Sequence, residues 1–301
     1  MLHLYYHARN TLFSRKGCGS VTFSNPEAGI YVPAGGDAMG ALAATTYLCV
    51  GAHPDDIEIM AYGPISRCFG TGRFTGVTVT DGGGSPRTGL YSQVSDAQMK
   101  KIRATEQNTA ARLGGYAAQV NLAWPSGGVK DPANRVLTGE LKALFLAAAP
   151  ETIYTHNLAD KHMTHVAVAM HVIRAVRELP AGSRPRLIGM EVWRGMDWLC
   201  DGDKIVEDTS ARPNISAALL GVYDSQISGG KRYDLATQGR RLANATFFAS
   251  HAVDACESAA FGLDMTPLVH DENLDPAAFI AGHIERFRAE VENCVRAFIN
   301  S

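Results

Sequence analysis

The stretch TYLCVGAHPDDIEIM (residues 46–60) decides the fold, because it joins an expected buried strand to an expected helix through a cluster of charges. Residues 46–52 form a near-continuous apolar run, which is typical of a strand buried on both faces. Residues 57–69 then have the apolar spacing of a helix, and Pro64 should kink this helix or mark its true start. A buried strand that leads directly into a helix indicates the first unit of a parallel sheet.

The same alternation of strand and helix patterns continues to about residue 193. Further strands are expected at 74–80, 118–124, 151–155 and 186–193, and helices at 96–115, 138–149 and 165–179. Asp96 is expected to cap the first of these helices, and Gly114 and Gly115 should end it. Strands that alternate with helices of this length predict a Rossmann-like α/β fold, with a mostly parallel sheet and helices on both faces.

Changes of pattern near both ends of the chain predict three regions. VTFSNPEAGIYVPAGG (residues 21–36) alternates apolar and polar positions between glycines and prolines, so residues 1–45 are expected to form a β-rich N-terminal arm. Residues 46–250 are expected to form the main catalytic α/β domain. Beyond residue 200 the pattern is irregular and more helical, so residues 251–301 are expected to be a helical extension, packed on the same domain as a C-terminal lobe.

The overall composition excludes several classes of partner. Of the 301 residues, 46% are hydrophobic and 19% are charged, which is typical of a globular protein with a sizeable core. The formal net charge of −2 provides no general polyanion-binding surface, so no nucleic-acid partner is expected. No apolar run is long enough to span a bilayer. The six cysteines are scattered and form no CxxC pair, which favours reduced thiols and a cytoplasmic location.

Polar segments follow three of the expected strands and should meet at one edge of the sheet. They are AHPDD (52–56), TDGGGS (80–85) and THNLADKHMTH (155–165). In doubly wound sheets, ligands gather beyond the carboxyl ends of the strands. These segments are therefore the first place to look for a functional site.

His53 and Asp56 are three residues apart at the expected strand-to-helix turn, so both side chains can face one point. A catalytic zinc ion uses three protein ligands and keeps one position for water. A third ligand is expected from the loop that offers His156, His162 and His165. Two imidazole nitrogens and one carboxylate oxygen suit zinc, with iron or manganese as alternative metals.

Asp55 lies between the two expected ligands, where it can reach the water that the metal would activate. The alternative is a solvated turn without a metal. Asp55 and Asp56 would then only stabilise a helix N-terminus, by about 0.3–1 kcal/mol, and the His-x-x-His pair would be polar surface. The occurrence of both motifs at one sheet edge favours the metal site. Glu58 is expected to be no more than a charge in the first turn of the helix.

The two motifs together resemble those of the PIG-L (LmbE-like) zinc-dependent de-N-acetylases. The resemblance rests on His53-Pro54-Asp55-Asp56 after a strand, followed by Asp160-x-His162-x-x-His165. It covers about residues 45–226 and includes Arg103-x-x-Glu106 in the helix before LGG. The pair of motifs is specific, whereas HPDD alone would only be suggestive.

The resemblance implies a role for each matching residue. The implied metal ligands are His53, Asp56 and His165, and the implied cofactor is Zn²⁺, with Fe²⁺ or Mn²⁺ as alternatives. Asp55 is the implied general base, and His162 the implied stabiliser of the oxyanion. Arg103 is implied in organising the site or the substrate, and Asp160 in supporting the ligands from behind.

The implied reaction is hydrolysis of an N-acetyl group on a small amino-sugar-type substrate. The alternatives are an amidase or esterase for a non-sugar acyl compound, or a metal- or ligand-binding protein without turnover. The candidate substrate-binding residues are Arg103, Asp81, Trp193, Asp197 and Gln226. Glu191 is a further candidate for binding hydroxyl groups.

Some positions depart from the family pattern or keep two interpretations. Gly83 is at the position where many members have glutamate, Tyr223 replaces a frequent histidine, and His-Met-Thr-His replaces the common His-Pro-Asp-His. The loop at 81–87 is either part of the substrate rim or a flexible loop. A basic cluster comprises Lys231, Arg232, Arg240 and Arg241. These residues either bind an anionic substrate or form the solvent-exposed face of a helix. The 1–45 arm is a candidate for self-association into a homo-oligomer.

Overall fold

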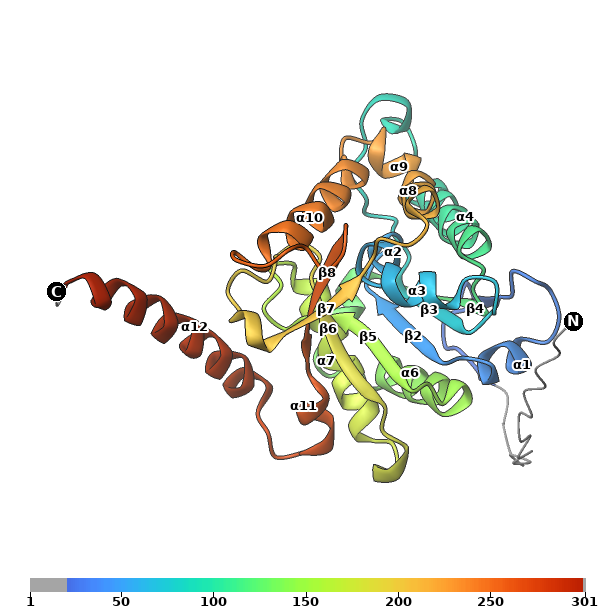
Figure 1. Cartoon of the computed structure of the whole chain (residues 1–301). Helices are drawn as coiled ribbons and strands as arrows, with labels where there is room; N and C mark the ends of the chain where they lie inside the picture. The colour runs from blue at the N-terminus through green and yellow to red at the C-terminus, as the bar shows by residue number, and fades with distance from the viewer. Residues whose placement is uncertain (1–20, 300–301) are drawn as a thin grey trace, which may run out of the picture.

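A single mixed sheet forms the centre of the computed structural model, which describes residues 21–299 (Figure 1). Within the described residues the sheet has eight strands in the order β1-β4-β3-β2-β5-β6-β8-β7. The strands are β1 (Gly29–Tyr31), β2 (Tyr47–Gly51), β3 (Phe74–Thr80), β4 (Ala118–Trp124), β5 (Thr152–His156), β6 (Arg186–Met190), β7 (Lys204–Asp208) and β8 (Ala259–Asp264). The predicted α/β fold with a mostly parallel sheet is confirmed.

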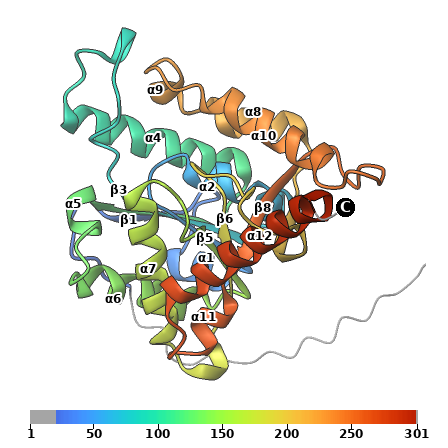
Figure 2. The same cartoon turned by 90° about the vertical axis from the view of Figure 1, so that its left-hand side faces the viewer.

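Helices cover both faces of the sheet, as Figure 2 shows. They are α1 (Ala38–Ala43), α2 (Asp56–Met60), α3 (Tyr62–Cys68), α4 (Asp96–Gly114), α5 (Ser126–Val129), α6 (Arg135–Ala148), α7 (Met163–Arg177), α8 (Pro213–Gly221), α9 (Asp224–Ile227), α10 (Tyr233–Phe247), α11 (Thr266–His270) and α12 (Pro276–Ile299). Short 3-10 turns lie at Gly89–Tyr91, Ala181–Ser183 and Asp201–Asp203.

Side chains from successive strand positions enter two separate cores, one on each face. Leu48 and Val50 of β2 pack into the core that α6 and α7 cover, whereas Cys49 packs into the core that α2, α3 and α4 cover. Each core removes apolar surface from water, which is the dominant favourable contribution to folding. The continuous apolar run that begins the fold-deciding stretch is therefore explained by burial on both faces.

The central strands are parallel and the outer ones are not. β2 pairs in parallel with β3 and β5, and the parallel arrangement continues to β4 and β6. β1, β7 and β8 pair antiparallel with their neighbours. The strands β7 and β8 were not expected, since the sequence pattern beyond residue 200 looked irregular and helical. The boundaries proposed near residues 45 and 250 stay a prediction, although β1 and β8 both belong to the common sheet.

Two helix boundaries in the structure differ from those expected from the sequence. Ser95, not Asp96, is the N-cap of α4: its side chain accepts a hydrogen bond from the Gln98 backbone, and the reciprocal bond completes a capping box. The expected helix at 57–69 is split at Ala61 into α2 and α3, and Pro64 lies in the first turn of α3, where its missing N–H costs little.

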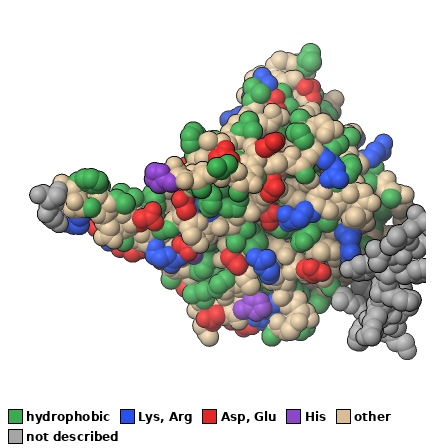
Figure 3. Space-filling view, in the orientation of Figure 1, with side chains coloured by type: hydrophobic (Ala, Val, Ile, Leu, Met, Phe, Trp, Pro, Cys, Tyr) green, Lys and Arg blue, Asp and Glu red, His purple; other side chains and the backbone are tan. Residues whose placement is uncertain are grey.

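The last helix, α12, extends away from the body of the molecule (Figure 1). Figure 3 shows hydrophobic side chains on this projecting helix. Ile284, Val291 and Val295 have 45%, 46% and 54% of their surface exposed. Across the described part of the chain, no helix combines the length and apolar character that a membrane span would need.

Candidate metal centre and substrate pocket

The turn between β2 and α2 places the first half of the site. Gly51 ends β2, and a Cβ atom there would lie 3.0 Å from Cγ1 of Ile57 and 3.1 Å from Cβ of Asp56, so the close return of the chain favours glycine. Asp55 follows with φ of 96°, outside the usual regions for a residue with a side chain. Such backbone strain is concentrated at functional sites.

Three side-chain atoms form a nearly equilateral triangle. Nδ1 of His53 lies 3.2 Å from Oδ2 of Asp56 and 3.2 Å from Nε2 of His165. Nε2 of His165 lies 3.4 Å from the same oxygen of Asp56. Ligand atoms on a tetrahedral zinc ion, with bonds of about 2.0–2.1 Å, would be separated by about 3.3–3.4 Å. The donor set and its spacing therefore fit a divalent metal.

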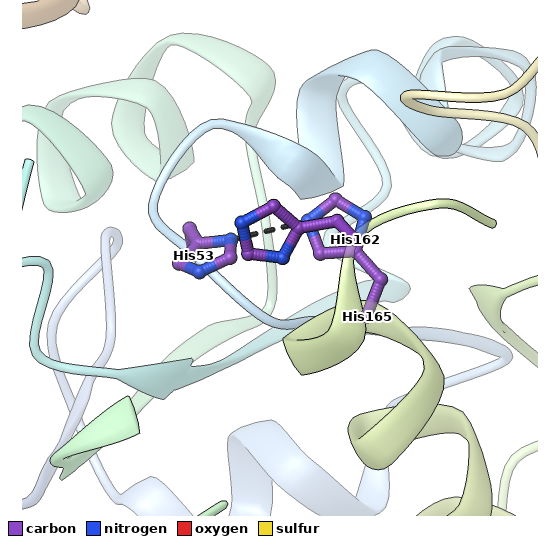
Figure 4. Close-up of side chains that lie close together, drawn as sticks. All are labelled: His53, His162 and His165. Atoms are coloured by element: carbon purple, nitrogen blue, oxygen red, sulfur yellow. Dashed lines mark hydrogen bonds between the residues drawn. The ribbon is translucent and has the colours of Figure 1, made fainter. Parts of the chain in front are cut away.

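Two loops bring the histidines together, as Figure 4 shows for His53, His162 and His165. His165 is in the first turn of α7 and His162 is the N-cap residue of that helix. The ring centroids of His53 and His162 are 4.9 Å apart. Ligand atoms of these three histidines also lie within 4.8 Å of one another, so His162 is next to the triangle.

His156 is close to the triangle but its accessible nitrogen is already used. Its Nε2 accepts a hydrogen bond of 2.9 Å from the backbone N–H of Ala52. Its ring stacks on His165 with centroids 3.8 Å apart. Nε2 of His156 also lies 3.4 Å from Oδ2 of Asp56, so Asp56, His156 and His165 form a second group whose ligand atoms are close enough for a metal. Because the hydrogen bond from Ala52 occupies the lone pair of this nitrogen, we assign His156 to supporting His165 rather than to binding the metal.

Asp160 lies behind His165. Its Oδ2 is 3.5 Å from Nδ1 of His165, an electrostatic contact that is too long for a strong hydrogen bond. Asp160 also accepts hydrogen bonds from the backbone N–H groups of His162 and Trp193. It thereby holds together the loop that carries the histidines and the segment that carries Trp193.

Asp55 is held by a buried cation rather than by the triangle. Nη2 of Arg103 donates to Oδ2 of Asp55 at 2.8 Å, and Arg103 also donates to the carbonyl of Pro54 and to Glu106. Burial raises the pKa of Asp55 to about 6, and the charge of Arg103 opposes this increase. A carboxylate with such a pKa is suited to accept a proton near neutral pH.

Glu58 differs from the sequence expectation of a simple early-helix charge. It is 1% exposed, and it accepts hydrogen bonds from Tyr116 at 2.7 Å, Tyr223 at 2.5 Å and Gln107 at 3.0 Å. Burial raises the pKa of Glu58 to about 7, although the three donors oppose the shift. Oε1 of Gln107 also accepts the backbone N–H of Asp55, so this buried network supports the turn.

A pocket of about 780 Å³ opens in front of the triangle. Of the predicted site residues it is lined by His53, Asp55, Asp56, Arg103, His162, Trp193 and Gln226. The buried residues His165 and Asp160 lie behind its wall. The glycine-rich loop also contributes, through Gly82, Gly84, Ser85 and Pro86.

Two predicted substrate-binding residues lie outside the lining of this pocket. Asp81 accepts the backbone N–H of Gly83 and pairs with Lys100 at 2.9 Å, so its carboxylate is used in shaping the loop. Asp197 is exposed and does not line the pocket. Both acids follow strand ends in the sequence, but their local turns direct them elsewhere.

The four residues of the basic cluster have different environments. Lys231 and Arg240 line the pocket, and the buried Arg241 also borders it while donating to Ser216 and to backbone carbonyls of α2. Arg232 instead forms an exposed pair with Asp234 at 2.8 Å. The lining residues that sequence reasoning missed include Lys130, Lys161 and Tyr233. Lys161 had one available signal, since it lies between two motif residues.

The comparisons with known proteins agree with this architecture. Residues 48–176 match the model of the PIG-L family, described as GlcNAc-PI de-N-acetylase. The chain is similar in structure to the N,N'-diacetylchitobiose deacetylase of Pyrococcus horikoshii, at 16% identity and a TM-score of 0.60, over 75% of this chain and 86% of that chain.

Two further solved structures show the same fold. A conserved protein from Thermus thermophilus has 20% identity and a TM-score of 0.56, with 77% of this chain and 99% of that chain covered. The 4-carboxy-2-hydroxymuconate hydratase of Pseudomonas putida has 18% identity and a TM-score of 0.57, with 77% and 100% covered. No curated protein sequence matches the chain. The family match spans both histidine-containing motifs, and the resemblance of this chain to the PIG-L (LmbE-like) family is thereby confirmed over residues 48–176.

Proposed function

We propose that this protein is a metal-dependent hydrolase that removes an N-acetyl group from a small amino-sugar-type substrate. The observation that carries the proposal is the triangle of His53, Asp56 and His165, with the buried Asp55 beside it. The PIG-L family match and the fold shared with a diacetylchitobiose deacetylase support it. A protein that only stored a metal would need neither Asp55 nor a pocket in front of the ligands.

We further propose zinc as the metal, because two imidazole nitrogens and one carboxylate oxygen suit this ion, with Fe²⁺ or Mn²⁺ as alternatives. His53, Asp56 and His165 would hold it. Such an ion supplies Lewis acidity and makes water a stronger nucleophile at neutral pH. Burial alone would raise the pKa of Asp56, but His165 and His156 hold it well below its usual value, so the carboxylate is ionised and ready to bind a cation.

Asp55 and His162 would then have separate roles in the reaction. Asp55, fixed by Arg103, accepts a proton from the attacking water and passes it to the amine nitrogen as the C–N bond breaks, which leaves free amine and acetate. His162 lines the pocket beside His53 and donates a hydrogen bond to the developing oxyanion. Burial and the neighbouring His165 and His53 lower the pKa of His162, so at neutral pH it acts as a neutral N–H donor. The substrate contacts proposed here are Arg103, Trp193 and Gln226.

Acetate release tests the proposal. The metal-loaded protein is incubated with a panel of N-acetyl sugars, and Asp55→Asn serves as the matched control because it keeps the shape but cannot accept the proton. Acetate release that depends on both metal and Asp55 supports the proposal. Metal binding without acetate release from any N-acetyl sugar would contradict it, and turnover of non-sugar amides or esters in the same assay would favour the amidase or esterase. The hydratase among the structural relatives makes addition of water without acetate release a further outcome to monitor.

We also propose that two copies of the chain associate through α12. Ile284, Phe287 and Val291 follow the alternating spacing of a coiled-coil seam on this projecting helix. Light scattering tests this: Ile284→Glu with Val291→Glu should give a monomer, while Val253→Glu, at a more exposed site outside the helix, should not. A monomeric wild type would reject it.

The cysteines support a cytoplasmic location as a further proposal. Cys49 and Cys68 are buried free thiols, and the other described cysteines are also unpaired. Unpaired thiols are typical of reducing compartments. Cell fractionation with an antibody to the untagged protein tests this proposal, and recovery outside the cytoplasmic fraction would reject it.

A further inference from the structure

The part of the pocket wall around Trp193 carries positive charge that has no carboxylate partner within the described part of the chain. Lys161, from the loop before α7, and Lys231, from the loop before α10, both line the pocket. Neither ammonium group has a carboxylate partner within ion-pair distance among the residues that the structure describes. The same holds for Lys130 on the rim. Exposed lysines are normally hydrated, but three of them around one pocket concentrate positive potential there.

Two of these ammonium groups lie near the ring of Trp193. Nζ of Lys231 lies 5.2 Å from the centre of the ring, and Nζ of Lys161 lies 6.0 Å from it. Each contact is a cation–π attraction between an ammonium group and the face of the indole. Two like charges at one ring also repel each other, and an anion bound between them would remove this repulsion.

The same tryptophan connects this basic wall with the proposed reaction centre. The Trp193 ring stacks beside His162, with centroids 6.1 Å apart and planes inclined by 24°. Tyr233 also makes an edge contact with Trp193, with ring centroids 6.1 Å apart. A substrate whose acyl group lies at His162 would therefore pass along the tryptophan and reach the two lysines one aromatic ring further on.

A buried donor and a buried acceptor add polar groups to the same pocket. Nε2 of Gln226 is buried and has no hydrogen-bond partner among the described residues, and Gln226 lines the pocket. Oε2 of Glu191 is likewise buried without a partner, while its Oε1 accepts from Asn244 and from the backbone of Phe261. Because unpaired buried polar groups are costly, these atoms indicate a polar ligand. Glu191 is the acid on this wall, and Arg240 lies close enough to offset part of its charge.

We propose that the pocket selects an N-acetylated substrate that carries an oxyanion, a phosphate or a carboxylate, on the side away from the acyl group, and that Lys161 and Lys231 bind this oxyanion beside Trp193. The proposal rests on the proposed deacetylase function for its acyl end, but the anion subsite itself is defined by the lysines and Trp193. Arg232, which the sequence suggested for such a role, is excluded because it pairs with Asp234 outside the pocket.

Equilibrium binding tests the subsite without requiring turnover. Isothermal titration calorimetry compares N-acetylglucosamine with N-acetylglucosamine 1-phosphate, and a carboxymethyl glycoside of the same sugar with its uncharged carboxamide. The wild type should bind each anionic compound at least tenfold more tightly than its neutral partner. The better of the two anions identifies phosphate or carboxylate as the natural group. Equal affinity for charged and neutral partners, or no binding of either anion, would overturn the proposal.

Three variants locate the effect. Lys161→Gln and Lys231→Gln should each weaken binding of the anionic compound about tenfold and leave the neutral compound unchanged, because each loses one direct charge contact. Arg232→Gln is the matched control, since it removes a nearby cation that lies outside the pocket. If Arg232→Gln weakened binding as much as the lysine variants, only general surface charge would be involved and the subsite would be rejected.

Acetate release on the same compounds separates this proposal from the proposed function. If the anionic compounds bind selectively but release no acetate, the anion subsite stands and the deacetylase function fails. If acetate is released equally well from charged and neutral compounds, the deacetylase function stands and the anion subsite fails. Selective release with a raised KM and an unchanged kcat in the lysine variants supports both.

Discussion

Nη2 of Arg103 donates to Oδ2 of Asp55 across 2.8 Å, and both side chains are nearly excluded from solvent. This pair predicts the acid side of the pH profile. Asp55 can accept a proton only when it is ionised, and burial raises its pKa to about 6 against the opposing charge of Arg103. Activity should therefore fall as the pH drops through about 6, or through a lower value once a divalent cation adds its positive charge.

Arg103→Gln should move this acid limb to higher pH, since the opposing positive charge is lost, whereas Arg103→Lys should keep it near the wild-type position. The measurement is kcat/KM for acetate release between pH 4.5 and 8.5. A limb that stays in place in Arg103→Gln would show that another group controls it.

His162 should be required for turnover but not for metal binding. Its nitrogen is near the triangle, yet His53, Asp56 and His165 already provide three ligands at the spacing that zinc uses. His162→Ala should retain stoichiometric metal by elemental analysis and lose on the order of 100–1000-fold in kcat, the usual cost of one oxyanion donor. Near-full activity would remove His162 from this role, and loss of the metal would make it a ligand.

Asp56 should be required for the metal. Its Oδ2 is shared by both histidine nitrogens, so Asp56→Asn removes the anionic ligand while keeping its size. This variant should lose the metal and show no increase in Tm when zinc is added. The wild type should gain about 4 kcal/mol at a thousandfold excess of free ion over its Kd. Asp81→Asn is the matched control, because Asp81 pairs with Lys100 outside the pocket lining, and it should keep both the metal and the Tm increase.

Glu58 should make stability depend on pH. Its pKa is raised by burial from 4.5 to about 7, so between these values the folded protein keeps a proton that the unfolded chain releases. The free energy of unfolding should therefore decrease as pH rises through this window, by on the order of 3 kcal/mol in total. Glu58→Gln has no proton to lose and should flatten this part of the profile. Urea unfolding of both proteins at pH 5 and pH 8 measures the difference, and parallel profiles would contradict the prediction.

The strand-and-helix framework from 46 to 193 could be predicted because its signals are local. Because β2 is buried on both faces, its sequence is a continuous apolar run, and turn residues mark the ends of the neighbouring elements. The strands β7 and β8 could not be predicted in the same way. They lie toward the edge of the sheet and pair antiparallel. The residues of β7, KIVED, mix polar and apolar types and are largely accessible. β8, AAFGLD, is buried and mostly apolar, but no strand-helix alternation surrounds it in the sequence to mark it as a strand.

The metal triangle was predictable because its two halves are compact motifs at strand ends. The burial and the partners of single polar residues could not be predicted, because they depend on residues that are distant in sequence. Glu58 looked like a helix-start charge, but Tyr223 reaches it from 165 residues away and buries it. Arg232 and Lys231 are adjacent in the sequence, yet one pairs with Asp234 on the surface and the other lies over Trp193.

The position of β8 between β6 and β7 has a consequence for biosynthesis. All three residues of the metal triangle leave the ribosome before β8 is made, whereas the backbone of Phe261, which holds Glu191 in the pocket wall, follows Glu191 by 70 residues. A nascent chain therefore possesses its complete ligand set while the edge of β6 still has unpaired backbone groups. Until translation passes residue 264, that open edge is the part of the molecule that most needs protection from aggregation.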